Sequence, residues 1–266
     1  WTEKILKILF TGYVPLPRDH SPLFYYGPVN TSINGNTLEG VRIRAGGMTT
    51  AWLHPHLFAR GYMAYGFKDQ RVKGLAELEY SFNEKKEYAN EFPIHSLKLS
   101  YYSDVNQYGQ NYLYTSKDNV FLALKRKKDD RIGYQQKAEL TYRHEYHSGF
   151  SYQLIARLRR DESSYLIPFI RQDENHTYVP SIANSELELK LRYAPGEKFF
   201  QTQWNRFPVS LDAPVFSLSH TMAAKGILGS DYNYQYTEAG FQKRFWFSAF
   251  GYVDLITKAG KVWNKV

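Results

Sequence analysis

Cysteine is absent from this chain of 266 residues. The absence excludes a disulfide framework, a thiolate metal site and a cysteine nucleophile. It permits an oxidising compartment such as a bacterial envelope without requiring one. The chain also begins with Trp1, and no targeting segment is visible. We therefore expect it to be part of a longer precursor whose targeting segment lies upstream.

Long apolar runs are absent as well. A helix that crosses a membrane needs about 18 or more uninterrupted apolar residues. Charged residues interrupt every candidate run, as Lys7 does within residues 5–10. The mean hydropathy of the chain is negative. This argues against spanning helices but not against a transmembrane β-barrel, because half of each barrel strand faces water.

Acidic residues are in the minority, with 26 Asp and Glu against 34 Lys and Arg and a net charge of +8. Such a charge is compatible with nucleic-acid binding, with an anionic lipid surface or with a basic pore lining. The chain has no long basic block, because most Lys and Arg alternate with apolar residues. We therefore predict a charged pore lining with charged rims, and no nucleic-acid partner.

Strict alternation of apolar and charged residues is what the sequence does contain. Every second residue is charged in the run Glu186, Leu187, Glu188, Leu189, Lys190, Leu191, Arg192 and Tyr193, and residues 137–144 repeat the pattern. Successive side chains of a strand point to opposite faces, so each such strand has one apolar and one charged face. Many long strands of this kind predict an all-β fold, an antiparallel transmembrane β-barrel with lipid outside and water inside.

Turn residues divide the chain into about twelve predicted strands. They cover residues 24–33, 37–50, 56–67, 71–82, 94–103, 117–127, 131–146, 149–160, 183–194, 214–225, 231–245 and 248–260. Asn34-Gly35 is the strongest hairpin signal and is expected to form the first turn. Short links at Asp69-Gln70, Asp129-Asp130 and His147-Ser148 alternate with long loops, as expected for a barrel whose two rims differ.

The N-terminal part of the chain has a different pattern. Residues 2–11 place apolar side chains on one side of a possible short helix, which Pro15 and Pro17 end. The helix is either interfacial at the barrel mouth or simply packed on the domain. We divide the chain into an N-terminal helix and linker at 1–23 and a barrel at 24–266 that continues beyond residue 266.

Aromatic residues cluster near the predicted strand ends. The clusters are Phe24, Tyr25 and Tyr26; Tyr62 and Tyr65; Tyr80 and Phe82; Tyr101 and Tyr102; Tyr112 and Tyr114; Tyr232, Tyr234 and Tyr236; and Phe245, Trp246 and Phe247. Amphipathic rings at the two headgroup levels form the aromatic girdles of membrane barrels. The alternative is that tyrosine suits any β surface.

Charged residues that alternate with apolar ones are expected to line the lumen of the barrel. They are Arg42, Arg44, Glu77, Glu79, Lys137, Glu139, Arg143, Arg157, Arg159, Glu186, Glu188, Lys190 and Arg192, with Lys98 as a further member. Such ladders either select ions or line a substrate path, or they pair with one another and plug the barrel. A charge that faced lipid at the midplane would cost about 2–4 kcal/mol.

Other constellations give weaker signals. His54-Pro55-His56 has no carboxylate nearby in sequence, so we predict no metal site there. Ser148, His144 and Asn175 are residue types that a lipid hydrolase uses, but nothing in their spacing requires them to meet. We therefore predict no catalytic residue, no cofactor and no metal.

One short basic run, Lys125 to Lys128, precedes Asp129-Asp130. At a hairpin tip such a run either contacts anionic headgroups, including lipopolysaccharide phosphates, or forms a solvated rim. The predicted partners are thus lipids of the outer membrane, with lipopolysaccharide as a candidate among them.

Four stretches resemble a known family. They are YGPVN at 26–30, LEGVRIRAGGMTT at 38–50, ARGYMAYGFKD at 59–69 and KAGKVWNKV at 258–266. Together they resemble the C-terminal part of an outer-membrane family of Bacteroidota whose function is unknown. Members of that family carry an N-terminal carboxypeptidase-like regulatory domain. The resemblance implies an outer-membrane barrel and a periplasmic partner for the module that precedes it, but it carries over no catalytic residues.

The sequence thus predicts a non-enzymatic β-barrel of the bacterial outer membrane, with a role in transport, assembly or anchoring. Two alternatives stay open. One is a barrel enzyme that acts on lipids, and the other is a soluble all-β module that binds glycans. A protein that stays soluble without detergent would exclude both membrane interpretations.

Overall fold

The computed structural model describes residues 11–17, 20–108, 131–171, 176–201, 206–209 and 212–264. The described residues are almost entirely in strands and turns. The helix predicted at 2–11 lies almost wholly outside this part of the chain, and the strand predicted at 117–127 lies outside it entirely. None of the helices in the described residues is both long enough and apolar enough to span a membrane.

Seventeen strands form within the described residues. They are β1 Val14–Leu16, β2 Phe24–Tyr26, β3 Ile33–Asn36, β4 Gly40–Thr49, β5 Leu57–Gly66, β6 Val72–Ser81, β7 His95–Gln107, β8 Ile132–Glu145, β9 Phe150–Glu162, β10 Phe169–Ile170, β11 Tyr178–Val179, β12 Ser181–Tyr193, β13 Phe199–Gln201, β14 Arg206–Pro208, β15 Val215–Ala223, β16 Tyr234–Trp246 and β17 Tyr252–Val262. Three short 3-10 turns join them: η1 Val29–Thr31, η2 Ile227–Gly229 and η3 Ser248–Phe250. The all-β prediction is confirmed.

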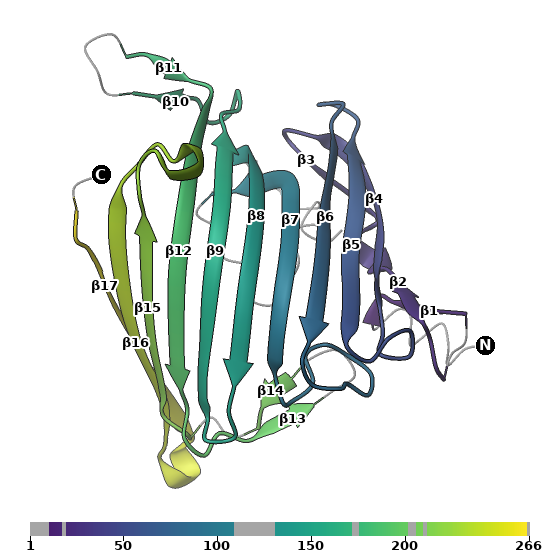
Figure 1. The fold of residues 1–266 in the computed structure, drawn as a ribbon, viewed down its shortest axis with the longest axis vertical. Helices are drawn as coiled ribbons and strands as arrows, with labels where there is room; N and C mark the ends of the chain where they lie inside the picture. Colours follow the sequence, from purple (N-terminus) through teal and green to yellow (C-terminus); the bar gives the residue numbers. More distant parts are fainter. Residues whose placement is uncertain are drawn as a thin grey trace.

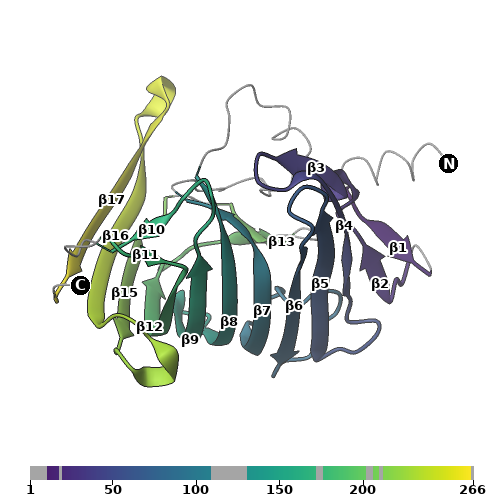
Figure 2. The same cartoon turned by 90° about the horizontal axis from the view of Figure 1, so that it is seen from above.

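The long strands run side by side in one 13-stranded antiparallel sheet (Figure 1). Its order is β1-β2-β4-β5-β6-β7-β8-β9-β12-β15-β16-β17, and β3 pairs with β4. The hairpins β10-β11 and β13-β14 form separate two-stranded sheets. Seen from above, the large sheet curves into a trough (Figure 2). Among the described residues β1 and β17 are its edges and do not pair, so the closed barrel stays a prediction.

The first hairpin differs from the prediction. The strand predicted at 24–33 is interrupted by η1, since Pro28 precedes this turn and cannot donate a backbone hydrogen bond. Asn34 and Gly35 lie inside β3, paired with β4, so the predicted position of the turn is wrong. The chain reverses at 37–39, because the Asn36 side-chain oxygen accepts hydrogen bonds from the backbone N–H groups of Leu38 and Glu39.

The expected alternation of short turns at one rim and long loops at the other is also wrong. Strands in this sheet alternate in direction, so links 67–71 and 163–180 lie at the upper rim of Figure 1 and links 146–149 and 194–214 at the lower rim. Each rim therefore carries both short and long connections. The two-residue period specifies the strands but contains no information about loop length.

The two faces of the sheet have opposite chemical character. On β12, Leu187 and Leu189 are 44% and 41% exposed, whereas Glu186 and Glu188 are only 6% and 8% exposed. Most soluble proteins show the reverse distribution. The one hydrophobic cluster of buried residues in the described part of the chain is small and consists of Leu38, Val105 and Ile132. The sheet therefore buries its charged face and exposes its apolar face.

Candidate functional site

The charged face is the concave one. Register shows that all thirteen predicted lining residues share one face, because side chains of directly opposed residues lie on the same side of a sheet. Arg42 on β4 reaches Asp104 on β7 across the two intervening strands. Side chains that far apart meet only where the sheet curves toward them. Whether this face lines a closed lumen stays a prediction.

Arg157 organises the middle of this face. The register places it on β9 between Glu139 of β8 and Glu186 of β12. Its guanidinium donates to Glu139, to Glu186 at 2.7 Å and to Glu188 at 3.1 Å. Tyr234 also donates a hydrogen bond to Glu186, at 2.7 Å. One cation of β9 thus joins three carboxylates of β8 and β12, and Tyr234 of β16 extends the network past β15.

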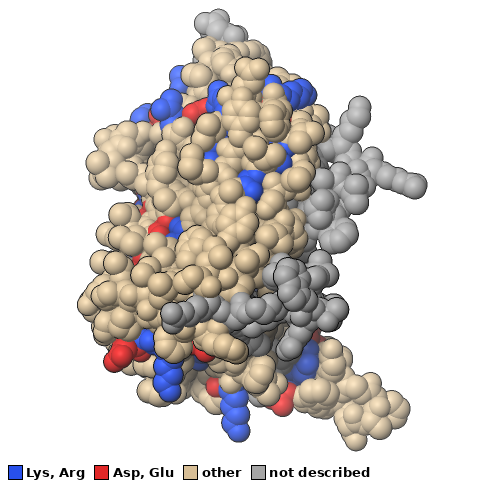
Figure 3. Space-filling view, turned by 90° about the vertical axis from the view of Figure 1, so that its right-hand side faces the viewer, with Lys and Arg blue, Asp and Glu red and all other residues tan. Residues whose placement is uncertain are grey.

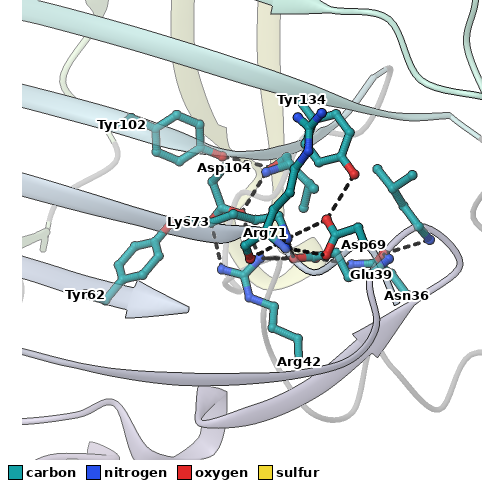
Figure 4. A network of polar contacts seen from close by, with 12 residues as sticks. Asn36, Glu39, Arg42, Tyr62, Asp69, Arg71, Lys73, Tyr102, Asp104 and Tyr134 are labelled. Carbon is teal, nitrogen blue, oxygen red and sulfur yellow. Dashed lines mark hydrogen bonds and ion pairs between the residues drawn. The ribbon is translucent and has the colours of Figure 1, made fainter. Parts of the chain in front are cut away.

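A second network lies near the upper rim and is more deeply buried (Figure 4). The side chains of Arg42, Glu39 and Asp104 have no exposed surface. Arg42 donates two hydrogen bonds to Asp104, at 2.7 and 2.8 Å, and a third to Glu39 at 3.1 Å. Tyr62 donates to Asp104 at 2.6 Å. The geometry between Arg42 and Asp104 is bidentate, which gives both strength and direction.

Lys73 extends this network toward the turn between β5 and β6. Its ammonium group lies 2.8 Å from Glu39 and 2.6 Å from Asp69. Tyr134 of β8 donates a hydrogen bond to Asp69 at 3.0 Å. Of this upper network the sequence analysis named Arg42 as a lining residue, Tyr62 among the aromatics and Asp69 only as part of a turn. The other members lie in turns or outside the strict alternation, so no local signal connected them.

A cavity of about 300 Å³ lies on the concave face in the lower half of the sheet. Residues of β4 to β9 and of the loop between β6 and β7 line it. Its polar lining consists of Thr49, Arg60, Glu77, Glu79, Tyr88, Asn90, Ser96, Lys98, Thr141, Arg143 and Gln153. Four of the predicted lining residues, Glu77, Glu79, Lys98 and Arg143, therefore meet here.

The charged side chains of the cavity differ in how closely they are paired with opposite charges. Glu77 pairs with Arg60 and lies 3.6 Å from Lys98. Glu79 forms no ion pair or hydrogen bond with any described residue, although it lines the same space. Arg143 has one long contact, 3.5 Å from Nη2 to Glu145, and its buried Nε has no acceptor. One carboxylate and one guanidinium thus face the cavity largely unsatisfied.

Lys85 holds the covering loop in place. It lies in the loop between β6 and β7, is nearly fully buried, and donates to the backbone carbonyl oxygens of Glu91 and Pro93. Burial lowers the pKa of Lys85 below its ordinary value, because desolvation penalises the ammonium form. The Glu91 carboxylate also stabilises this loop, because it accepts hydrogen bonds from the backbone N–H groups of Lys86, Glu87 and Tyr88.

The convex face carries an aromatic belt at the lower ends of the strands. The ring of His95 stacks on the rings of Phe82 and His144, with centroid distances of 4.3 and 4.2 Å. The ring of His144 also stacks on that of Tyr146, with a centroid distance of 4.2 Å. Other predicted girdle residues belong to the opposite face: Tyr62 and Tyr234 bind Asp104 and Glu186 there. Their assignment to a girdle is wrong. Tyr112 and Tyr114 lie outside the described residues.

Charge on the side of the molecule at the right of Figure 1 is concentrated toward the two ends (Figure 3). Lys and Arg are frequent in the upper part of this side and charges of both signs in the lower part, whereas the visible part of the middle carries fewer charged atoms. The basic run at 125–128 lies outside the described residues. A band with fewer charges between two charged rims is the distribution expected of a surface that contacts hydrocarbon.

The described residues of the other sequence candidates form local contacts within the fold. His54 Nδ1 accepts hydrogen bonds from two backbone N–H groups, and His56 Nδ1 lies 2.8 Å from the Ser81 carbonyl oxygen. In the part of the chain that the structure describes, no three His, Asp or Glu side chains form a group suited to a metal ion. His144 belongs to the aromatic belt, and Asn175 lies outside the described residues.

The fold and the site define an all-β protein with a curved antiparallel sheet, a charged concave face and an apolar convex face. Residues 6–266 match the model of the C-terminal domain of a family of unknown function, DUF5686. The chain belongs to this family, as the resemblance to an uncharacterised family anticipated. No curated protein and no solved structure matches it.

Proposed function

We propose that this chain is the barrel part of a β-barrel protein of the outer membrane of Bacteroidota. It is not an enzyme, and it acts in transport, assembly or anchoring through its charged interior. The observation that carries the proposal is the distribution of burial on β12, where leucines are exposed and glutamates are buried. Hydrocarbon around the convex face accounts for this distribution, because exposed leucine is unfavourable in water and favourable in lipid.

Strand length supports the same proposal. β7, β9, β12 and β16 each have 13 residues. At about 3.3 Å per residue and a tilt of about 40°, such a strand covers about 30 Å of membrane, the thickness of the hydrocarbon core. The aromatic belt at the lower strand ends then lies at one headgroup level.

Closure of the barrel follows from the same physics. Unpaired backbone N–H and C=O groups cost several kcal/mol each, by order of magnitude, in hydrocarbon. We therefore infer that the edges β1 and β17 are paired in the membrane, and that the charged face becomes the wall of a lumen. The carboxypeptidase-like regulatory domain expected upstream would then lie in the periplasm and bind a partner there.

Spin labels on the two faces of β12 test the membrane assignment. The chain has no native cysteine, so single cysteines at Leu187, Glu188 and Leu189 are labelled without background. In lipid vesicles, collisions with oxygen are expected to dominate at positions 187 and 189, and collisions with a water-soluble nickel complex at 188. Water-like accessibility at 187 and 189 would instead identify a soluble sheet and exclude both the barrel and a barrel enzyme.

Conductance in planar bilayers tests the lumen. Arg157→Ala leaves Glu139, Glu186 and Glu188 without their shared cation, so the reversal potential of the full-length protein is expected to shift toward cation selectivity. Arg160→Ala, on the other face of β9, is the matched control and is expected to leave selectivity unchanged. Unchanged selectivity in both Arg157→Ala and Glu188→Ala would remove the lining assignment. No conductance in the parent protein would favour a plugged interior.

A further inference from the structure

We propose that the cavity between β5 and β9 binds a small zwitterion, a molecule with one ammonium group and one carboxylate or phosphate group. The carboxylate of Glu79 binds the ammonium group, and the guanidinium of Arg143 binds the anionic group. This inference deepens the proposed function by naming a ligand class for the interior. It depends on the proposed function only for the route by which the ligand arrives.

The first step of the argument is the state of Glu79. It projects from β6 into the cavity, directly opposite Lys98 of β7 in the register. The ammonium group of Lys98 lies 3.6 Å from Glu77 instead. Glu79 has no ion-pair partner among the described residues, so its charge is uncompensated by direct contact. A partly buried carboxylate in that state favours a cation, because it has lost water without gaining a partner.

The second step is the state of Arg143. Its neighbour Glu145 accepts a hydrogen bond from Arg206 at 2.6 Å and lies 3.5 Å from Arg143 at its nearest. Glu145 therefore pairs more closely with Arg206 than with Arg143. The Arg143 side chain keeps 39% of its surface exposed, and its Nε has no acceptor. A guanidinium in that state is suited to a planar carboxylate or a phosphate, which it binds through two parallel hydrogen bonds.

The third step is the space between the two charges. β6 and β8 are separated only by β7, so their backbones lie about 10 Å apart. Glu79 and Arg143 form no direct ion pair within 4.0 Å, although both line one cavity of about 300 Å³. That volume is at the small end of ligand pockets, which are about 300–1,000 Å³. It suits a molecule of the size of an amino acid, a dipeptide or a phosphorylated amino alcohol.

Polar groups on the remaining walls complete the site. Ser96, Thr141 and Gln153 lie on β7, β8 and β9, and they place neutral donors and acceptors around the two charges. Arg60 pairs with Glu77, and Lys98 lies 3.6 Å from the same carboxylate. A ligand with a single charge would leave either Glu79 or Arg143 unsatisfied, and this selects for a ligand that carries both charges.

Calorimetric titration of the full chain in detergent tests the proposal. The probes are the dipeptide Ala-Ala and phosphoethanolamine, both zwitterionic, with N-acetyl-Ala-Ala as the anion alone and Ala-Ala-amide as the cation alone. At least one zwitterion is expected to bind about tenfold more tightly than either singly charged probe. Which zwitterion binds better distinguishes a peptide-like ligand from a lipid headgroup or a related phosphate.

Variants assign the two ends of the ligand. Glu79→Gln is expected to abolish the tighter binding of Ala-Ala compared with N-acetyl-Ala-Ala. Arg143→Gln is expected to abolish the tighter binding of Ala-Ala compared with Ala-Ala-amide. Glu238→Gln is the control, since Glu238 on β16 does not line this cavity. Equal binding of all four probes, or no binding of either zwitterion, overturns the site. These outcomes do not depend on the spin-label result, so failure of the site and failure of the membrane assignment are distinguishable.

Discussion

Asp104→Ala is expected to lower the free energy of unfolding by about 3–5 kcal/mol. The variant removes both hydrogen bonds that Arg42 makes to Asp104 and the acceptor of the Tyr62 hydroxyl. Arg42 has no exposed side-chain surface, so its charge cannot be rehydrated without opening the upper end of the sheet. Glu39 stays within hydrogen-bond distance of Arg42 but is shared with Lys73, so the buried guanidinium loses part of its compensation. Losing a buried partner costs more than breaking a surface pair. Denaturant unfolding in detergent measures the change.

Asp254→Ala is the matched control for this experiment. Asp254 also pairs with an arginine in bidentate geometry, at 2.6 and 2.7 Å from Arg244, but its side chain is 36% exposed. The bidentate geometry is thus similar, whereas Asp254 has more solvent access and Asp104 also accepts a hydrogen bond from Tyr62. The denaturation midpoint of Asp254→Ala is expected to stay close to that of the parent. If the two variants shift the midpoint equally, burial does not set the strength of the Asp104 pair.

Leu187→Arg is expected to cost about 2–4 kcal/mol when the protein is folded into lipid vesicles. Leu187 is 44% exposed on the convex face and lies at the middle of β12. In a soluble protein a surface leucine at this exposure accepts arginine with little effect, within about 0.5 kcal/mol. In a bilayer the same guanidinium must leave water for hydrocarbon. The sign and size of the effect therefore report what surrounds this face.

Tyr193→Arg provides the depth control for Leu187→Arg. Tyr193 is on the same face of β12 but is its last residue, where the strand meets the lower rim. Arginine near an interface costs about 0–1 kcal/mol, since the side chain extends to the headgroups. A stability ranking of parent, Tyr193→Arg and Leu187→Arg, in that order, is expected from reversible unfolding in vesicles. Two variants that both match the parent would argue against hydrocarbon at position 187.

Sequence reasoning located most strands to within a few residues, because alternation is a local property that each strand carries in full. β5, β6, β9 and β12 begin and end close to the ranges expected from the pattern alone. The error at Asn34-Gly35 has a local cause: two overlapping turn signals compete, and the Asn36 side chain stabilises the later turn. A dipeptide preference cannot decide between turns that differ by two residues.

The candidate site was only partly accessible from sequence. Alternation identified Glu79 and Arg143 as residues of the charged face, but not that they lie on either side of one cavity with little direct pairing. That arrangement depends on which arginine pairs with Glu145. Arg206, which donates a hydrogen bond to it, lies in a hairpin 61 residues away in the chain. Local patterns contain no information about such competition between distant partners.

By itself the sequence determined that every long strand has one charged and one apolar face, because successive side chains of a strand must point in opposite directions. Only the tertiary structure decided which face is concave and which charges meet there. Arg42 and Asp104 are 62 residues apart, and they meet because the sheet between them is curved. Curvature is the sum of twist over many strand pairs, so it belongs to the sheet and not to any one segment.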